Sequence, residues 1–493
     1  MAAPCQTERM RRPSLGRQPQ ERARPSPRPN ILLLMTDQHR WDALGCAGGW
    51  VRTPALDRLA AEGTRFANAY TNSPSCVPAR ASLATGVYPH KIDVWKTATY
   101  TLPRDAPTWM RAVRDAGYST SLFGKTHLHS QRGDLRDRED LVRSWGLEEI
   151  DEIAGPRAAT ASHSNLTDLW RQAGVYEAYQ TDLRERYSTK AWVTRPSPLP
   201  LPLYPDVYVG QRAAAYLRSL VGGRPWFCWV SFAGPHEPWD APEPYASLFD
   251  PASMPQPIHA EVDRHDRPRG RVDDRLAAGG VPFGPGDIPR LRANYAGKVR
   301  LIDDQIADIL EVIERRGDLD NTVVAFVSDH GEMNGDFNLL YKHNFLDPAV
   351  RIPFIVRRPP CADAPTGAVS NAMVELRDLG ATLVDLAGGV AVEGSRARSL
   401  VPALNDPARA HRRYVLAKLR NETMLADARW KLAANRSGEA YMLYDHLTDP
   451  HETRNLAGLA EYDDIAKRLI LRTKRRARDR SRPRPAAPEV DVG

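Results

Sequence analysis

The chain has 493 residues, of which 42% are hydrophobic and 26% are charged, so it can bury a large core and exceeds the size at which a single core usually stops growing. No window approaches the roughly 20 apolar residues of a membrane span, and the first residues lack the apolar stretch of a secretory signal, so we expect neither a membrane-spanning nor a secreted protein. The five cysteines are odd in number and widely spaced, which favours a reducing, cytoplasmic setting over a disulfide framework.

The net charge of +7 lies in the two terminal segments. Residues 1–30 carry seven arginines against two glutamates, and residues 461–493 carry ten basic against six acidic residues, which leaves the body of the chain at a net −2. Both segments are rich in arginine and proline, so residues 1–29 and 461–493 are predicted to be solvated tails. Neither has interleaved aromatic residues, so we expect no specific nucleic-acid partner and no membrane partner.

The body of the chain alternates predicted strands and helices. The predicted strands cover residues 30–35, 66–70, 118–123, 226–232 and 322–327, and the predicted helices cover residues 54–62, 108–116 and 301–315. Residues 131–205 and 251–289 show no clear period and are interpreted as insertions or lids. The pattern predicts an α/β catalytic domain over residues 30–389.

From about residue 390 the pattern changes to short alternating segments. These segments, residues 414–418, 423–426, 430–432 and 441–444, predict a small antiparallel sheet in a C-terminal subdomain over residues 390–460.

Polar residues follow the predicted strands of the first domain. Asp37 and Gln38 follow one strand, and Asp329 and His330 follow another. In open α/β sheets ligands gather at the carboxyl ends of strands, and these side chains offer hard oxygen and nitrogen ligands to one divalent cation. We expect the two pairs to come from opposite ends of the sheet. Taken alone, an Asp at a strand end is more often a helix cap, and an Asp-His step is more often a hydrogen-bonded surface turn.

The segment Cys76-Val77-Pro78-Ala79-Arg80, continued to Thr85-Gly86, is predicted to form a helix. Pro78 suits the first turn, Gly86 can end the helix, and Arg80 lies on the same face as Cys76. Arg80 could therefore hold a group on Cys76 or a neighbouring acidic ligand. The alternatives are a small buried cysteine before a helix and an arginine in a surface salt bridge.

This segment resembles the signature of the sulfatase family (type I, formylglycine-dependent). The resemblance extends over about residues 30–460, because residues 328–333 resemble the last metal-ligand strand and residues 430–432 and 443–456 resemble the closing segment of the family. It implies an alkaline-phosphatase-like α/β sandwich, with a large central mixed sheet flanked by helices and a small C-terminal antiparallel sheet. It also implies that Cys76 is oxidised to formylglycine (3-oxoalanine) by a formylglycine-generating enzyme.

The resemblance implies roles for the residues at the strand ends. The metal ligands would be Asp37, Gln38, Cys76, Asp329 and His330, and the ion would be Ca²⁺ by family, with Mn²⁺ and Mg²⁺ as alternatives. The catalytic residues would be Cys76, Arg80, Lys125, His127, His236 and Lys342.

The implied mechanism proceeds through a covalent hemisulfate. One hydroxyl of the hydrated aldehyde attacks sulfur, Lys125 neutralises a sulfate oxygen, and His236 and Lys342 assist the leaving alcohol. His127 then takes the proton from the second hydroxyl, so that sulfate leaves. His129 and His343 are interpreted as supporting residues.

The sequence also departs from the family pattern. Gln38 and His330 stand where animal arylsulfatases have Asp and Asn, which looks more like the bacterial choline-sulfatase, arylsulfatase and phosphonate monoester hydrolase branches. Residues 94–97 lack an Asn that relatives often carry there, and Gly335-Asp336-Phe337 replaces a Gly-Asp-His sequence. We therefore expect altered contacts to the substrate.

The predicted function is hydrolysis of a small-molecule sulfate monoester. One alternative is a phosphonate monoester or phosphodiester hydrolase on the same scaffold, because phosphoryl transfer needs nearly the same cationic surroundings. The other is a non-catalytic anion-binding protein in which Cys76 stays a thiol.

Overall fold

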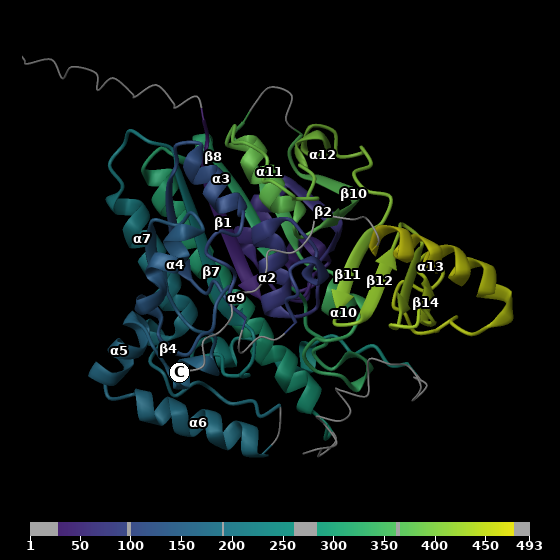
Figure 1. Cartoon of the computed structure of the whole chain (residues 1–493). Helices are drawn as coiled ribbons and strands as arrows, with labels where there is room; N and C mark the ends of the chain where they lie inside the picture. Colours follow the sequence, from purple (N-terminus) through teal and green to yellow (C-terminus); the bar gives the residue numbers. More distant parts are fainter. Residues whose placement is uncertain (1–27, 96–99, 190–191, 261–282, 361–364, 478–493) are drawn as a thin grey trace, which may run out of the picture.

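Figure 1 shows the computed structural model, which describes residues 28–95, 100–189, 192–260, 283–360 and 365–477. Within these residues an eight-stranded sheet has the order β10-β2-β9-β8-β1-β7-β3-β5, and a separate four-stranded sheet has the order β11-β12-β13-β14. No helix in the described ranges is both long enough and apolar enough to cross a lipid bilayer.

The strands of the large sheet are β1 (Asn30–Asp37), β2 (Thr64–Tyr70), β3 (Ser119–Gly124), β5 (Glu149–Glu152), β7 (Trp226–Pro235), β8 (Thr322–Ser328), β9 (Phe354–Arg357) and β10 (Ala368–Glu375). All neighbouring pairs are parallel except those of β9, which runs antiparallel to β2 and β8. The carboxyl ends of the other strands therefore meet along one edge, as the alternating sequence pattern predicts. A short pair, β4 (Gly133–Asp134) and β6 (Ser162–His163), lies outside this sheet.

Helices cover both faces of the large sheet (Figure 1). The described helices of this domain are α1 (Pro54–Glu62), α2 (Cys76–Thr85), α3 (Trp109–Asp115), α4 (Glu139–Ser144), α5 (Asn165–Gln172), α6 (Tyr176–Thr189), α7 (Pro205–Ser219), α9 (Asp287–Arg315), α10 (Asp347–Val350), α11 (Asp378–Leu386) and α12 (Val401–Asn405), of which α5 and α6 lie beyond the strand ends.

The central strand β1 shows how the core forms. Ile31, Leu33 and Met35 pack with residues of α2, α3 and α11, whereas Leu32 and Leu34 pack on the opposite face with residues of α1, α7 and α9. Since successive side chains of a strand point to opposite faces, a continuous apolar run is what a strand covered on both faces requires. Each of these side chains is fully buried, which is worth about 1.5–3 kcal/mol apiece before entropy is counted.

The small sheet consists of β11 (Val415–Leu419), β12 (Glu422–Ala426), β13 (Trp430–Ala434) and β14 (Ala440–Asp445), all antiparallel, at the positions that the sequence predicts. One face packs against residues of the large domain, including Tyr70 and Phe345. The other face contacts helix α13 (Asp463–Ala477), which places Leu469 in the core. Residues 463–477 are therefore helical, whereas the sequence favoured a solvated tail from residue 461.

Two further expectations differ from the structure. The predicted insertion at residues 131–205 contributes β5 to the large sheet, and the helix predicted over residues 301–315 begins at Asp287. Neither element shows a clear hydrophobic period in the sequence, because each buries charged side chains that are hydrogen-bonded inside the protein. Asp151 of β5 accepts from Tyr208 and Arg212, and Lys298 of α9 donates to two backbone carbonyls.

Candidate active site

Three adjacent strands bring the predicted ligands together. β1 lies between β8 and β7, with Thr36 opposite Ser328 and Asp37 opposite Pro235. Asp37 and Asp329 thus leave neighbouring strands side by side, and the expectation that they come from opposite ends of the sheet is wrong. The order of strands along the chain does not give their order in the sheet, because a long crossover can return to the centre.

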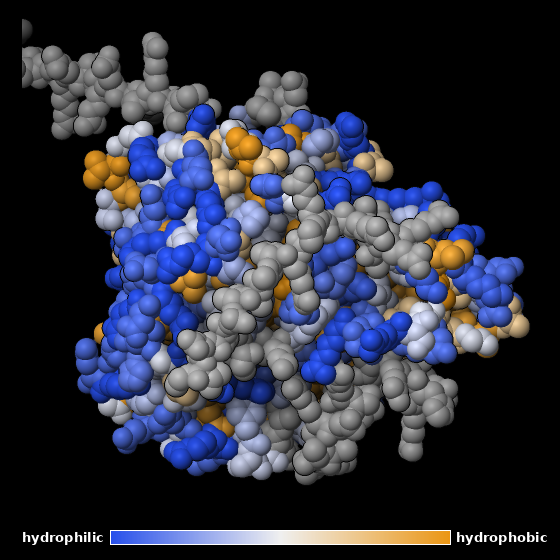
Figure 2. Space-filling view, in the orientation of Figure 1, coloured by the Kyte–Doolittle hydropathy of each residue, from blue (hydrophilic) through white to orange (hydrophobic). Residues whose placement is uncertain are grey.

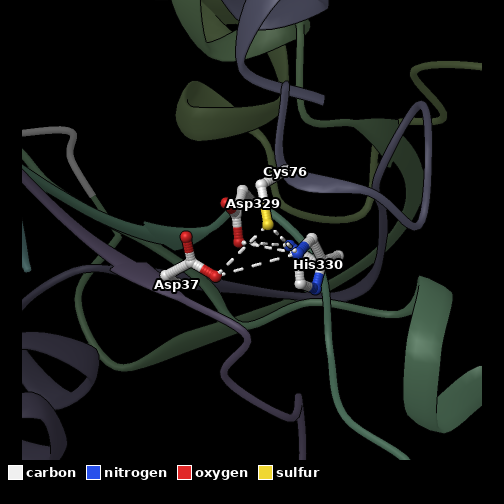
Figure 3. Close-up of side chains that lie close together, drawn as sticks. All are labelled: Asp37, Cys76, Asp329 and His330. Carbon is white, nitrogen blue, oxygen red and sulfur yellow. Dashed lines mark hydrogen bonds and ion pairs between the residues drawn. The ribbon is translucent and has the colours of Figure 1, made fainter. Parts of the chain in front are cut away.

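Cys76 is the first residue of α2 and lies among the predicted metal ligands (Figure 3). Its Sγ is 3.1 Å from Nε2 of His330 and 3.6 Å from Oδ1 of Asp37. Ligand atoms of Asp37, Cys76, Asp329 and His330 all lie within 4.8 Å of one another, and all four residues are buried. Helix α2 ends at Gly86, whose φ of 71° is the left-handed conformation that glycine adopts without strain.

Arg80 lies one helical turn after Cys76 on α2 and hydrogen-bonds both aspartates. Its guanidinium donates to Oδ2 of Asp329 at 2.7 Å and to Oδ2 of Asp37 at 3.2 Å. It also donates to the Lys125 carbonyl at 2.7 Å and to the Ser231 hydroxyl at 2.9 Å. The side chain is fully buried, so Arg80 fixes acidic ligands and is no surface ion pair.

Cations surround the buried carboxylates. Burial opposes ionisation of Asp37, but Lys125, 2.5 Å from Oδ2, together with His236 and Arg80, holds the pKa of Asp37 well below its usual range. Burial and the charge of Asp37 raise the pKa of Asp329. Two carboxylates this close in a buried site favour a bound cation between them.

The environment of Cys76 is electropositive. Burial would raise the pKa of its thiol, but Lys342, His330 and Lys125 lower that pKa well below its ordinary value. The pKa of His330 shifts in the opposite direction. Burial opposes protonation of the imidazole, yet Asp329 and Cys76 raise its pKa to about 9. Position 76 is therefore adapted to hold negative charge.

Gln38 is fixed in one orientation. Its amide nitrogen donates to Oε2 of Glu237 at 3.0 Å and also to Glu332, so its amide oxygen faces the Lys342 ammonium, which donates to it. Its φ of 69° is unusual for a non-glycine residue, and such backbone conformations cluster at functional sites. The sequence did not single out Glu237 and Glu332, because neither has a spacing signal; only their adjacency to His236 and to the residues after Asp329 marks them.

The predicted basic residues also converge. Lys342 Nζ lies 2.8 Å from Nε2 of His236. His127 hydrogen-bonds the Cys76 side chain, and burial and then Lys125 lower the pKa of its imidazole to about 4. A neutral imidazole can accept a proton, and its buried Nδ1 has no hydrogen-bond partner among the described residues.

Other residues lie around the site in supporting positions. Nε2 of His129 is 2.7 Å from Glu152, and the backbone N–H of His343 donates to the carbonyl of Pro74, in the loop before Cys76. Asp336 pairs with Arg40 and Arg292. Of the departures at residues 94–97, Lys96 and Thr97 lie outside the described residues.

The donor set fits a divalent cation. Asp37 and Asp329 supply carboxylate oxygens and His330 supplies a nitrogen, which suits Ca²⁺, Mg²⁺ or Mn²⁺. The Cys76 thiol is the soft exception, and its replacement by an aldehyde hydrate would complete an oxygen-rich set. The side chain of Gln38, which the sequence also predicted as a ligand, has other partners: its oxygen accepts from Lys342, and its nitrogen donates to Glu237 and Glu332.

The chain is similar to several known proteins. Residues 29–390 match the family model described as Sulfatase, and residues 335–479 match the model described as N-sulphoglucosamine sulphohydrolase, C-terminal. An arylsulfatase of Clostridium perfringens is 29% identical over 462 residues, covering 90% of this chain and 94% of the relative. A choline-sulfatase of Rhizobium meliloti is 28% identical, covering 87% and 82%. The phosphonate monoester hydrolase of Agrobacterium radiobacter has a similar structure, with a TM-score of 0.75 at 24% identity over 91% of this chain and 96% of that one.

Proposed function

Because the chain belongs to the sulfatase family of hydrolases, with an alkaline-phosphatase-like fold, we propose that it hydrolyses a sulfate monoester through a formylglycine formed from Cys76 and one divalent metal ion. The observation that carries the proposal is the position of Cys76. Its sulfur lies 3.1 Å from His330 and 3.6 Å from Asp37, at the start of a helix and within a ring of buried cations. A buried structural cysteine needs none of these neighbours.

Metal and aldehyde supply the electrophilic and nucleophilic chemistry. When bound by Asp37, Gln38, Asp329 and His330, the ion would polarise the sulfuryl oxygens. The oxidised residue 76, as its hydrate, would supply one hydroxyl for attack on sulfur and a second whose deprotonation releases sulfate. A maturation enzyme would have to oxidise the thiol beforehand.

The remaining groups of the site have distinct tasks in this proposal. Lys125 and Lys342 place positive charge beside position 76, where they would stabilise the sulfuryl oxygens of the transition state. His236, whose Nε2 lies 2.8 Å from Nζ of Lys342, would give a proton to the departing alcohol oxygen. His127, which contacts the Cys76 side chain, would accept the proton of the second hydroxyl.

The test compares protein that carries the aldehyde with protein that retains the thiol. The chain is produced with and without a formylglycine-generating enzyme, and the mass of the peptide containing Cys76 gives the converted fraction. We expect hydrolysis of 4-nitrophenyl sulfate to rise in proportion to that fraction and to fall at least about 100-fold in Cys76→Ala. Activity that is independent of conversion would contradict the formylglycine mechanism.

Phenyl phosphonate monoesters, assayed with the same preparations, distinguish the alternative hydrolase. A preference for the phosphonate over the aryl sulfate by orders of magnitude in kcat/KM would replace the sulfate ester as the substrate. Absence of both activities from fully converted, metal-loaded protein would favour the non-catalytic anion-binding protein.

A further inference from the structure

A groove lies beside the candidate active site, between helix α6 and the turn at residues 158–160. It has a volume of about 580 Å³ and is lined by Arg157, Thr160, Gln180, Leu183, Arg184, Tyr187 and Ser188. Among the described residues, those that line the groove include two arginines and no acidic residue, and most of the others carry a hydroxyl or an amide. Such a surface suits an anion that also bears hydroxyl groups.

Arg157 connects the groove to the catalytic groups. Its guanidinium donates to Oε1 of Glu237 at 2.7 Å, and Oε2 of the same carboxylate lies 3.1 Å from Nδ1 of His236. The guanidinium also lies 5.9 Å from the ring centroid of Tyr341, the residue before Lys342. The groove therefore adjoins the pair His236 and Lys342, to which the proposed function assigns the leaving alcohol.

Arg157 is held in place and still accessible. Its guanidinium lies over the Tyr187 ring, 4.1 Å from the centroid, and about half of its side chain is exposed (49%). Glu237 uses one of its nitrogens, and a guanidinium carries five N–H donors, so it retains donors for a ligand. Arg184 lies on the exposed side of α6, where its guanidinium donates to the hydroxyl of Thr181 at 3.1 Å.

The position of α6 agrees with this assignment. In Figure 1, α5 and α6 lie at the bottom of the molecule, beyond the carboxyl ends of the strands. α6 and the segment after it contact Trp239, three residues after His236: Arg186 of α6 donates to the Trp239 carbonyl, and Thr194 forms a β-bridge with Trp239. Figure 2 shows a mainly hydrophilic surface over these helices.

We propose that this groove binds the alcohol portion of the substrate, and that this portion is a polyhydroxylated ring carrying a second anionic group, such as a sulfate or carboxylate, which pairs with Arg157 and Arg184. The inference rests on the proposed function and specifies its substrate class. A cationic alcohol such as choline would be disfavoured at the same place, because both arginines would repel it.

The test uses three sulfate esters that differ in the charge of the alcohol. These are glucosamine 2-N,6-O-disulfate, 4-nitrophenyl sulfate and choline sulfate. In Arg184→Glu and in Arg157→Gln, we expect the ratio of kcat/KM for the disulfate to kcat/KM for the aryl sulfate to fall at least about tenfold, mainly through KM. The ratio for choline sulfate to aryl sulfate should rise in Arg184→Glu. Arg468→Gln, an exposed arginine of α13, is the matched control and should leave both ratios unchanged.

A binding measurement separates this inference from the proposed reaction. Calorimetric titration of the Cys76→Ala variant with the disulfate needs no turnover. In the double variant that also carries Arg184→Glu, the Kd for the disulfate should rise at least about tenfold. If aryl sulfate is hydrolysed but neither the ratios nor the Kd respond to Arg157 and Arg184, the groove is not the alcohol subsite. If the Kd responds while no sulfate ester is hydrolysed, the subsite stands and the proposed reaction fails.

Discussion

Lys431 of the small C-terminal sheet forms a buried ion pair with Asp347 at the start of α10, with Nζ 2.7 Å from Oδ1. The same ammonium contacts Glu452, which also pairs with His446 at 2.9 Å. Carbonyls of α10 accept the backbone N–H groups of Gly331 and Glu332, the two residues after His330. The small sheet thus helps to position the loop that carries a candidate metal ligand.

Replacing Lys431 by methionine should destabilise the protein strongly. The change removes the buried ammonium that contacts the carboxylates of both Asp347 and Glu452, and the loss of one partner from a buried ion pair typically costs about 3–5 kcal/mol. Denaturant unfolding followed by tryptophan fluorescence measures the difference. Lys467→Met, at a side chain that is 70% exposed, is the control and should change the free energy of unfolding by less than about 0.5 kcal/mol. Similar stability of the two variants would show that Lys431 has no such role.

Arg80→Lys should abolish most activity although it keeps the charge. A lysine ammonium cannot reproduce the fork that reaches Asp329, Asp37, the Lys125 carbonyl and Ser231 together. We expect kcat/KM for an aryl sulfate to fall by about 100-fold or more, with less metal retained after dialysis. Ser231→Ala removes one of these contacts and should have a much smaller effect. An Arg80→Lys protein with normal metal content and normal kcat/KM would contradict this account.

Gln38→Glu should weaken metal binding, although a carboxylate is ordinarily the better ligand for a hard cation. The amide nitrogen of Gln38 donates to Glu237 and Glu332, so the variant would bring three carboxyl groups together in a buried space. We expect a clear loss of bound metal, measured by atomic emission on the purified protein. Gln305→Glu is the comparison, because this buried glutamine of α9 lies beside Gly210 of α7, and the variant should retain its metal. Tighter metal binding by Gln38→Glu would show that Gln38 is not held by its two acidic partners.

The sequence predicted most of the fold and named residues that the structure brings together, but it did not predict how their strands are arranged. The apolar run at residues 30–35 and the Cys76 segment each specify an element and the polar group at its end, so the positions of Asp37 after a strand and of Cys76 at the start of a helix could be predicted. The adjacency of β1 and β8 could not, because it depends on tertiary packing. Glu237 and Arg157 were missed for a related reason: each acts through a partner that is distant in sequence, and a lone Glu or Arg gives no periodic signal.

Lys418 should make the stability depend on pH in the alkaline range. This lysine of β11 is buried, donates to Thr423, and lies near Lys91, so burial and then that charge lower the pKa of its ammonium from 10.5 to about 8. Between these two values the unfolded chain binds more protons than the native protein, so the free energy of unfolding rises with pH there; below about pH 8 the full cost of burying the charge is present.

Lys418→Met removes that cost, and we expect it to be more stable than the wild type by about 1–3 kcal/mol near neutral pH. The advantage should shrink as the pH approaches about 10, as measured by urea unfolding at several pH values. Lys467→Met should show no such trend relative to the wild type, and a difference between Lys418→Met and the wild type that is constant over this range would mean that Lys418 stays protonated without cost.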